Sequence, residues 1–216
     1  MTDPFNALSM AQEQLADLDQ QLLKRTLRVT DTPCDTKARV AGRVLKAFCS
    51  NDYLGFANHP DLAEELAAGA KSYGVGSGAS HLISGHSIAH DLLEKKLASF
   101  QAAHIPHART LFFSTGYMAN LAAITGLARL AERSEVSLYS AKLNHASLID
   151  GVRLASAQLN AAVTLFDHNC PSELIESLKK DTKSLKIIVT DGVFSMDGDL
   201  APARELLKIA EDFDAL

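Results

Sequence analysis

Two short polar segments combine residue types that could bind an anion or move a proton. The run STGY at 114–117 joins hydroxyls to a glycine, where a strand is expected to give way to a helix. Free backbone N–H groups at a helix start favour phosphate, although Ser and Thr there also serve as ordinary helix caps. His145, in the run NHAS at 144–147, could carry a proton. A lone histidine is most often solvated or capping, so only its place after a strand makes it a candidate.

A third segment, DGVFSMDGD at 191–199, offers a serine and three aspartates. Ser195 stands in no G-x-S-x-G turn and has no adjacent histidine–acid pattern, which argues against a hydrolase nucleophile. The aspartates could suggest a cation site, but their glycine neighbours favour turns. We therefore expect no metal here.

The glycine-rich run GVGSG at 74–78 resembles a dinucleotide fingerprint only superficially. That fingerprint needs a strand before it, whereas a helix is expected here. His81 and His86 flank the run at a spacing that is weak evidence for metal binding. We expect a tightly turned loop without a metal.

The elements that must position these residues follow from periodicity. Strands are predicted at 110–113, 136–139, 163–166 and 186–190, alternating with helices at 86–100, 117–131, 146–157, 171–181 and 202–213. This alternation is typical of βαβ units with a parallel sheet. Ligands bind beyond the carboxyl ends of such strands, so the three polar segments are expected at one rim.

The N-terminal part is predicted to be simpler. Apolar residues spaced three or four apart from Leu8 to Leu22 indicate a helix that ends in a basic run, Lys24 to Arg28. A polar linker, a short strand around 44–48 and a helix from Pro60 toward Tyr73 follow.

Composition excludes several classes of protein. The 216 residues are 47% hydrophobic and 22% charged, with net charge −5, which is ordinary for a globular chain and offers no basic footprint for nucleic acid or an anionic membrane. Three scattered cysteines (Cys34, Cys49, Cys170) indicate a reducing compartment, and no signal-like start is present, so we expect a cytoplasmic protein. The uncharged stretch 110–128 is interrupted by polar residues, which favours strand, turn and buried helix over a membrane span.

Five motifs, taken together and in order, resemble the α-oxoamine synthases, pyridoxal-phosphate enzymes of the aspartate-aminotransferase fold. They are FCSNDYLG at 48–55, GSGASHLISGHS at 76–87, FFSTGYMAN at 112–120, LNHASLIDG at 143–151 and TDGVFSMDGDLAP at 190–202. The resemblance runs from about Arg25 to Leu216. It implies an α/β fold with a three-layer, mostly parallel sheet flanked by helices, in which the large domain is incomplete. The expected division is an N-terminal helix and arm at 1–47 and a partial cofactor-binding domain at 48–216.

The resemblance also implies roles for particular residues. Gly116 and Tyr117 would contact pyridoxal phosphate, and Ser195 would hydrogen-bond it. His145 would lie over the pyridine ring and near the substrate, and Arg25 would bind a substrate carboxylate. Ala141 departs from the family, which usually has aspartate just before the LNHAS motif.

Two motifs are most similar to the branch that condenses L-alanine with a pimeloyl thioester, carried by CoA or a carrier protein, with loss of carbon dioxide, in biotin biosynthesis. These are GSGASHLISGHS and DGDLAP. The DGVFSMDG core is shared with 2-amino-3-ketobutyrate CoA ligase, which remains the alternative. Family membership further implies a homodimer with sites at its interface.

Family members carry the lysine that binds the cofactor covalently, and the acid that faces the pyridine nitrogen, in later motifs. None of the twelve lysines present stands at the family's position, and Lys142 is merely near the expected site. We therefore expect this chain alone not to be a competent synthase. The alternative is a non-catalytic module that binds a partner.

Overall fold

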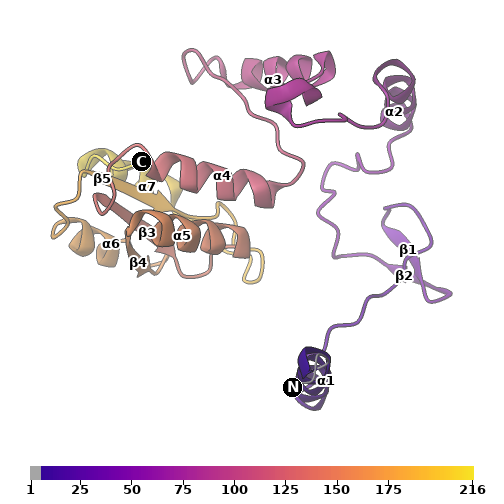
Figure 1. Ribbon diagram of the computed structural model, residues 1–216, viewed down its shortest axis with the longest axis horizontal. Coiled ribbons are helices and arrows are strands. Elements are labelled where there is room, and N and C mark those ends of the chain that lie inside the picture. Colours follow the sequence, from indigo (N-terminus) through magenta and orange to yellow (C-terminus); the bar gives the residue numbers. More distant parts are fainter. Residues whose placement is uncertain (1–5) are drawn as a thin grey trace. The chain divides into compact units, whose positions relative to one another are not determined.

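The computed structural model describes residues 6–216, and the chain divides after Ser87 into two compact units. The N-terminal unit contains two helices, a two-stranded hairpin and a short π-helix (Figure 1). They are α1 (Asn6–Gln20), β1 (Lys37–Val40), β2 (Arg43–Lys46), α2 (Pro60–Tyr73) and η1 (His81–Gly85). Residues 1–5 of the predicted arm lie outside the described residues, and the predicted boundary at residue 47 stays a prediction.

Two details of this unit differ from expectation. The first helix ends at Gln20, not beyond Leu22, because Leu22 adopts a left-handed φ of 58° and the N–H of Leu23 turns back to the carbonyl of Leu18 at 2.8 Å. The predicted strand near residue 44 is present as β2, but it has an unpredicted antiparallel partner, β1. Ala41 and Gly42, which form the two-residue loop of this hairpin, both have positive φ, as a type I′ turn requires.

The C-terminal unit, residues 88–216, confirms the predicted α/β architecture. Its parallel sheet has the order β4-β3-β5 (Figure 1). The strands are β3 (Val136–Ala141), β4 (Ala162–Phe166) and β5 (Leu185–Val189). The helices are α3 (Ile88–Gln101), α4 (Gly116–Ala128), α5 (Ala146–Leu159), α6 (Pro171–Leu178) and α7 (Ala203–Asp212).

Three layers result from the alternation of side chains along the central strand β3. Leu138 faces an apolar cluster shared with α4 and α5, whereas Tyr139 faces a second cluster shared with α6 and α7. Helix α5 packs closely on α4 because residue 151 is glycine: a Cβ there would come within 2.7 Å of Ile124 Cδ1. Each sheet face is therefore covered by one helix pair.

The prediction of a strand at 110–113 is wrong. Among the described residues this segment pairs with no strand, and the Phe112 N–H donates to the Glu94 side chain at 2.9 Å instead. The stretch 110–128 thus becomes an extended segment followed by the 13-residue helix α4. Among residues 6–216, no helix has the length and apolarity needed to cross a bilayer.

The outer edge of β5 is occupied by the last described residue. Leu216 donates its N–H to the Lys186 carbonyl at 2.9 Å and accepts from the Ile188 N–H at 2.8 Å. This pair of bonds is the parallel ladder pattern, so the hydrogen-bonded sheet extends past β5 by one residue.

Candidate functional site

The start of α4 has the features of an anion site. Thr115 caps the helix, its Oγ1 accepting the Met118 N–H at 3.2 Å. The N–H groups of Gly116 and Tyr117 have no carbonyl partner inside the helix, as in any first turn. A Cβ built on Gly116 would meet nothing within 4 Å, so an incoming group has room beside the backbone. The cap and the anion site are compatible, because the cap uses only one of the unpaired donors.

Tyr117 is held from the neighbouring helix. Its phenol donates to the Asp150 carboxylate on α5, and Asp150 also pairs with Arg153 at 3.4 Å. The hydrogen bond to Asp150, with smaller contributions from burial and the carboxylate charge, raises the pKa of Tyr117. The residue stays 43% exposed, which leaves the ring available for contact.

His145 is the N-cap of α5 and is fixed through both backbone and ring. Its backbone N–H donates to Asp191 Oδ2 at 2.6 Å. Its Nδ1 accepts the Ser147 N–H at 3.2 Å and lies 2.7 Å from Ser147 Oγ. Ser147 Oγ in turn accepts from Asn120 Nδ2 on α4 at 2.9 Å. Two of the predicted site elements, the start of α4 and His145, are thus connected through side chains.

Asn144 joins the ends of two strands, and we call its contacts the Asn144 clamp. Its Nδ2 donates to Ser140 Oγ at 3.0 Å and to the Val189 carbonyl at 2.8 Å, and its Oδ1 accepts the Asp191 N–H at 2.9 Å. The residue is buried, so these bonds satisfy groups that water cannot reach. The clamp sets the position of Asp191, which holds His145. Sequence reasoning assigned no role to Asn144, although an amide directly after a strand end was the available signal.

Ser195 lies at the tip of a hairpin that follows β5. The Phe194 N–H donates to the Asp199 carbonyl at 2.9 Å, and the Gly198 N–H returns to the Phe194 carbonyl at 2.8 Å. Gly198 has a φ of +78°, a conformation that favours glycine. Ser195 is exposed, and within residues 6–216 no hydrogen bond joins it to His145. The structure therefore places Ser195 on the expected loop without a direct contact to the rest of the site.

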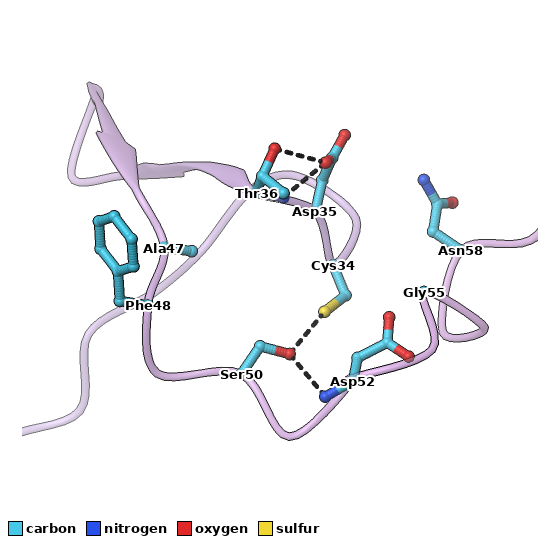
Figure 2. Close-up of a pocket in the computed structure, with 9 residues that line it drawn as sticks. All are labelled: Cys34, Asp35, Thr36, Ala47, Phe48, Ser50, Asp52, Gly55 and Asn58. Carbon is cyan, nitrogen blue, oxygen red and sulfur yellow. Dashed lines mark hydrogen bonds between the residues drawn. The ribbon is translucent and has the colours of Figure 1, made fainter.

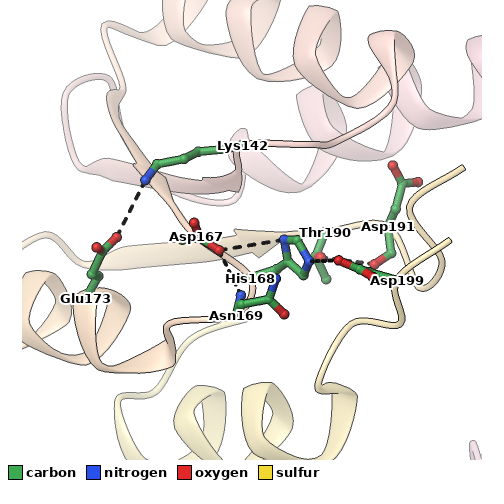
Figure 3. Close-up of polar contacts among 8 residues, drawn as sticks. All are labelled: Lys142, Asp167, His168, Asn169, Glu173, Thr190, Asp191 and Asp199. Atoms are coloured by element: carbon green, nitrogen blue, oxygen red, sulfur yellow. Dashed lines mark hydrogen bonds and ion pairs between the residues drawn. The ribbon is translucent and has the colours of Figure 1, made fainter. Parts of the chain in front are cut away.

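His168, at the end of β4, anchors this hairpin (Figure 3). Its side chain is buried, its ring centroid lies 4.1 Å from that of Phe194, and its Nε2 lies 3.4 Å from Asp199 Oδ2. Asp167 approaches the other ring nitrogen at 3.9 Å. Sequence reasoning missed His168, because nothing local links it to a loop some thirty residues later.

The remaining predicted residue, Arg25, belongs to the N-terminal unit. It is exposed in the coil after α1, next to Lys24, which pairs with Asp19 at 3.8 Å. Its role as a carboxylate ligand stays a prediction.

The N-terminal unit has a cavity of about 400 Å³ beside the FCSNDYLG motif (Figure 2). On its wall, Cys34 Sγ lies 3.3 Å from Ser50 Oγ, which accepts the Asp52 N–H at 3.0 Å. The Asp52 carboxylate accepts the backbone N–H groups of residues 56 and 57, so the motif closes a turn on itself. Across residues 6–216, no group of three or more His, Cys, Asp or Glu side chains is arranged to hold a metal ion.

Comparison with known proteins identifies the family to which this chain belongs. The family model for aminotransferase class I and II matches residues 45–215. The chain is 50% identical over 204 residues to 8-amino-7-oxononanoate synthase of Janthinobacterium sp. (strain Marseille), covering 94% of this chain and 50% of that protein. It is 48% identical over 211 residues to the synthase of Burkholderia mallei (strain SAVP1), covering 98% and 52%.

Two solved structures are similar to this chain over most of its length. A serine palmitoyltransferase variant from S. paucimobilis, solved with a bound PLP–myriocin aldimine, is similar with a TM-score of 0.80 and 27% identity, over 99% of this chain and 52% of that one. An 8-amino-7-oxononanoate synthase from Francisella tularensis is similar with a TM-score of 0.57 and 31% identity, over 75% and 41%. The chain spans about half the length of the curated relatives it matches.

Proposed function

Because the chain belongs to the aminotransferase class I and II family, we propose that it supplies part of a pyridoxal-phosphate-dependent 8-amino-7-oxononanoate synthase. The reaction would condense L-alanine with a pimeloyl thioester, carried by CoA or a carrier protein, and release carbon dioxide and the free thiol carrier. When bound, pyridoxal phosphate supplies an electron sink for carbanion chemistry at the amino acid. Because the chain matches only about half of the length of a curated synthase, this activity has to be tested with the other half present.

One observation carries the proposal: His145 is held through both its backbone and its ring at the start of α5, in the loop that follows β3. Asp191 binds its backbone N–H at 2.6 Å, and Ser147 links its ring to Asn120 on α4. A residue that serves only as a solvated cap needs no such support. Side chains fixed in this way are typical of groups that must meet a ligand in one geometry.

The residues present fit the phosphate of the cofactor. Gly116 and Tyr117 present unpaired N–H groups at the positive end of α4, with open space over Gly116. An anion placed there would be bound by backbone donors, and Thr115 would keep the first turn in register. Tyr117 would contact the cofactor with its ring, because its hydroxyl is already engaged by Asp150.

The other roles follow from the family resemblance. His145 would cover the pyridine ring and exclude water from that face. Ser195 would donate a hydrogen bond to the cofactor, from a hairpin whose base is anchored by Phe194 and His168. Arg25 would bind the carboxylate of the pimeloyl group, and the working assembly would be a homodimer.

We further propose that residues 1–216 do not supply the lysine that binds the cofactor. Support comes from where the ammonium groups point. Lys142, the lysine beside the site loops, pairs with Glu173 on α6 at 3.7 Å (Figure 3). Lys183 donates to the Ser134 carbonyl, and Lys208 donates to Asp212. Borohydride treatment of the chain with pyridoxal phosphate should therefore label no single lysine stoichiometrically, and specific labelling together with turnover would refute this part.

The activity is tested by pairing this chain with the remaining half of the Janthinobacterium synthase, as a fusion or by coexpression. We expect the hybrid to bind pyridoxal phosphate and to release carbon dioxide from L-alanine with pimeloyl-CoA. His145→Phe should abolish turnover. His104→Phe, the same substitution at an exposed histidine after α3, is the matched control and should retain it.

The alternative members of the family are separated by substrate. Hybrid assays with glycine or L-serine, each with acetyl-CoA or palmitoyl-CoA, run in parallel with alanine and pimeloyl-CoA. A hybrid that binds the cofactor and prefers one of these pairs would overturn the proposed substrate while keeping the family. If it binds no cofactor although its folded half is intact, the non-catalytic module becomes the better account.

A further inference from the structure

A hydrogen-bonded chain of three residues runs from α4 to the ring of His145. Asn120 Nδ2 donates to Ser147 Oγ at 2.9 Å, and Ser147 Oγ lies 2.7 Å from His145 Nδ1. Ser147 is buried and Asn120 is half-buried, so solvent does not freely exchange with these partners. The direction of donation along this chain decides which ring nitrogen carries the proton.

The backbone of Ser147 favours one direction. Its N–H donates to His145 Nδ1 at 3.2 Å, and a nitrogen that accepts a hydrogen bond carries no proton in the neutral ring. The Ser147 hydroxyl must then donate to Nδ1 as well, because two proton-free lone pairs facing each other at 2.7 Å would repel. Ser147 Oγ is left to accept, and the Asn120 amide supplies the donor.

We propose that Asn120 and Ser147 fix the neutral ring of His145 in the tautomer with its proton on Nε2. His145 then presents an N–H donor on the side away from α5, and both other residues are positioning residues that act through it. This role rests on the proposed function, in which the donor would face the bound cofactor and substrate. The tautomer itself is a property of the chain alone.

The chain offers a matched pair of variants. Asn120→Asp keeps the size of the side chain but replaces the donating amide with an acceptor. The Ser147 hydroxyl should then turn toward the new carboxylate, and its oxygen should accept from a protonated Nδ1, because the 2.7 Å contact with Oγ outweighs the longer 3.2 Å bond from the Ser147 N–H. Asn160→Asp makes the same chemical change at another Asn–Ser pair, an exposed one in which Asn160 Nδ2 donates to Ser134 Oγ at 3.0 Å. Asn160 is the C-cap of α5, at the opposite end of the helix from His145.

The experiment is nitrogen-15 NMR of the imidazole rings in the full chain, with His145 assigned by comparison with His145→Gln. Spectra are recorded at about pH 8.5, roughly two units above the pKa of a free imidazole. We expect the wild-type ring and Asn160→Asp to show a protonated Nε2 and a bare Nδ1. Asn120→Asp should exchange the two signatures. Ser147→Ala should move both shifts only partway toward the average, because the backbone N–H that still faces Nδ1 favours a bare Nδ1 more weakly than the hydroxyl and the N–H together.

A wild-type spectrum with the proton on Nδ1 would overturn the proposal. So would an Asn120→Asp spectrum identical to that of Asn160→Asp. If Asn120→Asp does not fold, Ser147→Ala gives the same decision, since unchanged shifts in that variant contradict the proposed chain of bonds.

In the hybrid enzyme, Asn120→Asp should lower kcat by about 10- to 100-fold with little change in KM, the pattern of a misdirected proton donor. Ser147→Thr keeps a hydroxyl and should retain most of the activity. These readouts separate two failures. A correct tautomer in a hybrid without synthase activity would reject the proposed function alone, whereas an active hybrid with the wrong tautomer would reject this inference alone.

Discussion

Helices α1 and α7 carry similar apolar spacing but differ in what covers them. In α7, of the C-terminal unit, Leu206 and Ile209 are 5% and 4% exposed. In α1, of the N-terminal unit, Leu15 and Leu18 are 51% and 39% exposed, and no residue of the helix is buried. The comparison teaches that periodicity specifies a helix, whereas burial needs a second apolar surface, here the sheet face under α7.

Polar contacts divide the units in the same way. In the C-terminal unit, Asn144 and His145 bond to partners 45 to 47 positions away. In the N-terminal unit, the Asp52 carboxylate reaches only four and five positions along the chain. Long-range bonds hold one unit together, whereas local turns dominate the other, so equivalent substitutions should have unequal effects.

Matched leucine deletions should give the largest difference between the units. Leu174 is 0% exposed in the cluster between the sheet and α6, and Leu27 is 100% exposed. Leu174→Ala should lower the free energy of unfolding by about 2–5 kcal/mol, because it removes buried contacts and leaves a cavity. Leu27→Ala should change it by less than about 0.5 kcal/mol. Urea denaturation measures both, and equal losses would show that α1 and its surroundings are packed after all.

Glycine substitutions should differ in sign. Gly151→Ala puts a methyl group 2.7 Å from Ile124 Cδ1, which must move. We therefore expect the free energy of unfolding to fall by about 1–3 kcal/mol. Gly69→Ala, within α2, meets nothing within 4 Å and should stabilise that helix by up to about 1 kcal/mol. Thermal and urea unfolding test the pair. A stabilised Gly151→Ala would mean that α4 and α5 separate at little cost.

Tyrosine variants should distinguish the units at alkaline pH. Burial and the 2.7 Å hydrogen bond to Asp181 raise the pKa of Tyr139 above its ordinary value of 10.0. The raised pKa means that the protonated phenol contributes to the free energy of unfolding. This contribution is fully present below pH 10 and is lost as the pH rises from there toward the folded-state pKa, because the tyrosine of the unfolded chain ionises first. Tyr139→Phe should remove that alkaline loss and cost about 1 kcal/mol at neutral pH.

Tyr73→Phe, on an exposed residue of α2, is the control and should leave the alkaline profile unchanged. Stability measured by urea denaturation at several pH values decides the question. An alkaline loss of unchanged size in Tyr139→Phe would assign it to another group.

The smallest effects are expected at surface ion pairs, where the units should not differ. Lys95 pairs with Asp91 at 2.8 Å on α3, and Lys24 pairs with Asp19 at 3.8 Å after α1. We expect Lys95→Gln and Lys24→Gln each to lower the free energy of unfolding by less than about 0.5 kcal/mol, because exposed charges are screened by water and salt. Unfolding at low and high salt measures them. A larger cost for Lys24→Gln alone would place that region in a less exposed setting.

The sequence predicted the sheet and most of its helices, because strands and helices of the C-terminal unit have distinct periods and clear starts. Pro60 and Pro171 mark the beginnings of α2 and α6 within one residue of expectation. The strand at 110–113 failed because a strand exists only where a neighbour pairs with it. Its apolar run looks the same whether it pairs or, as here, donates to Glu94.

The site was predictable by residue but not by contact. His145 follows β3 as expected, whereas the strand expected before Gly116 is not formed within residues 6–216, and the roles of both residues stay predictions. The Asn144 clamp and His168 were missed. Asn144 bonds to groups 45 and 47 positions away and His168 lies beside a carboxylate 31 positions away, and no local pattern reveals which loops meet across a sheet. Family resemblance named the residues that would touch the cofactor, whereas the structure identifies those that hold them.

The Asn144 clamp has a consequence for how this edge can evolve. Two of its three bonds go to main-chain groups, the Val189 carbonyl and the Asp191 N–H. Main-chain groups are the same whatever side chain a position carries, so Thr190, between them, can be replaced freely without releasing Asn144. An insertion or deletion of one residue there would instead shift Asp191 out of reach of His145. Position 190 is therefore tolerant of changes in its side chain, whereas the loop around it is intolerant of a change in length.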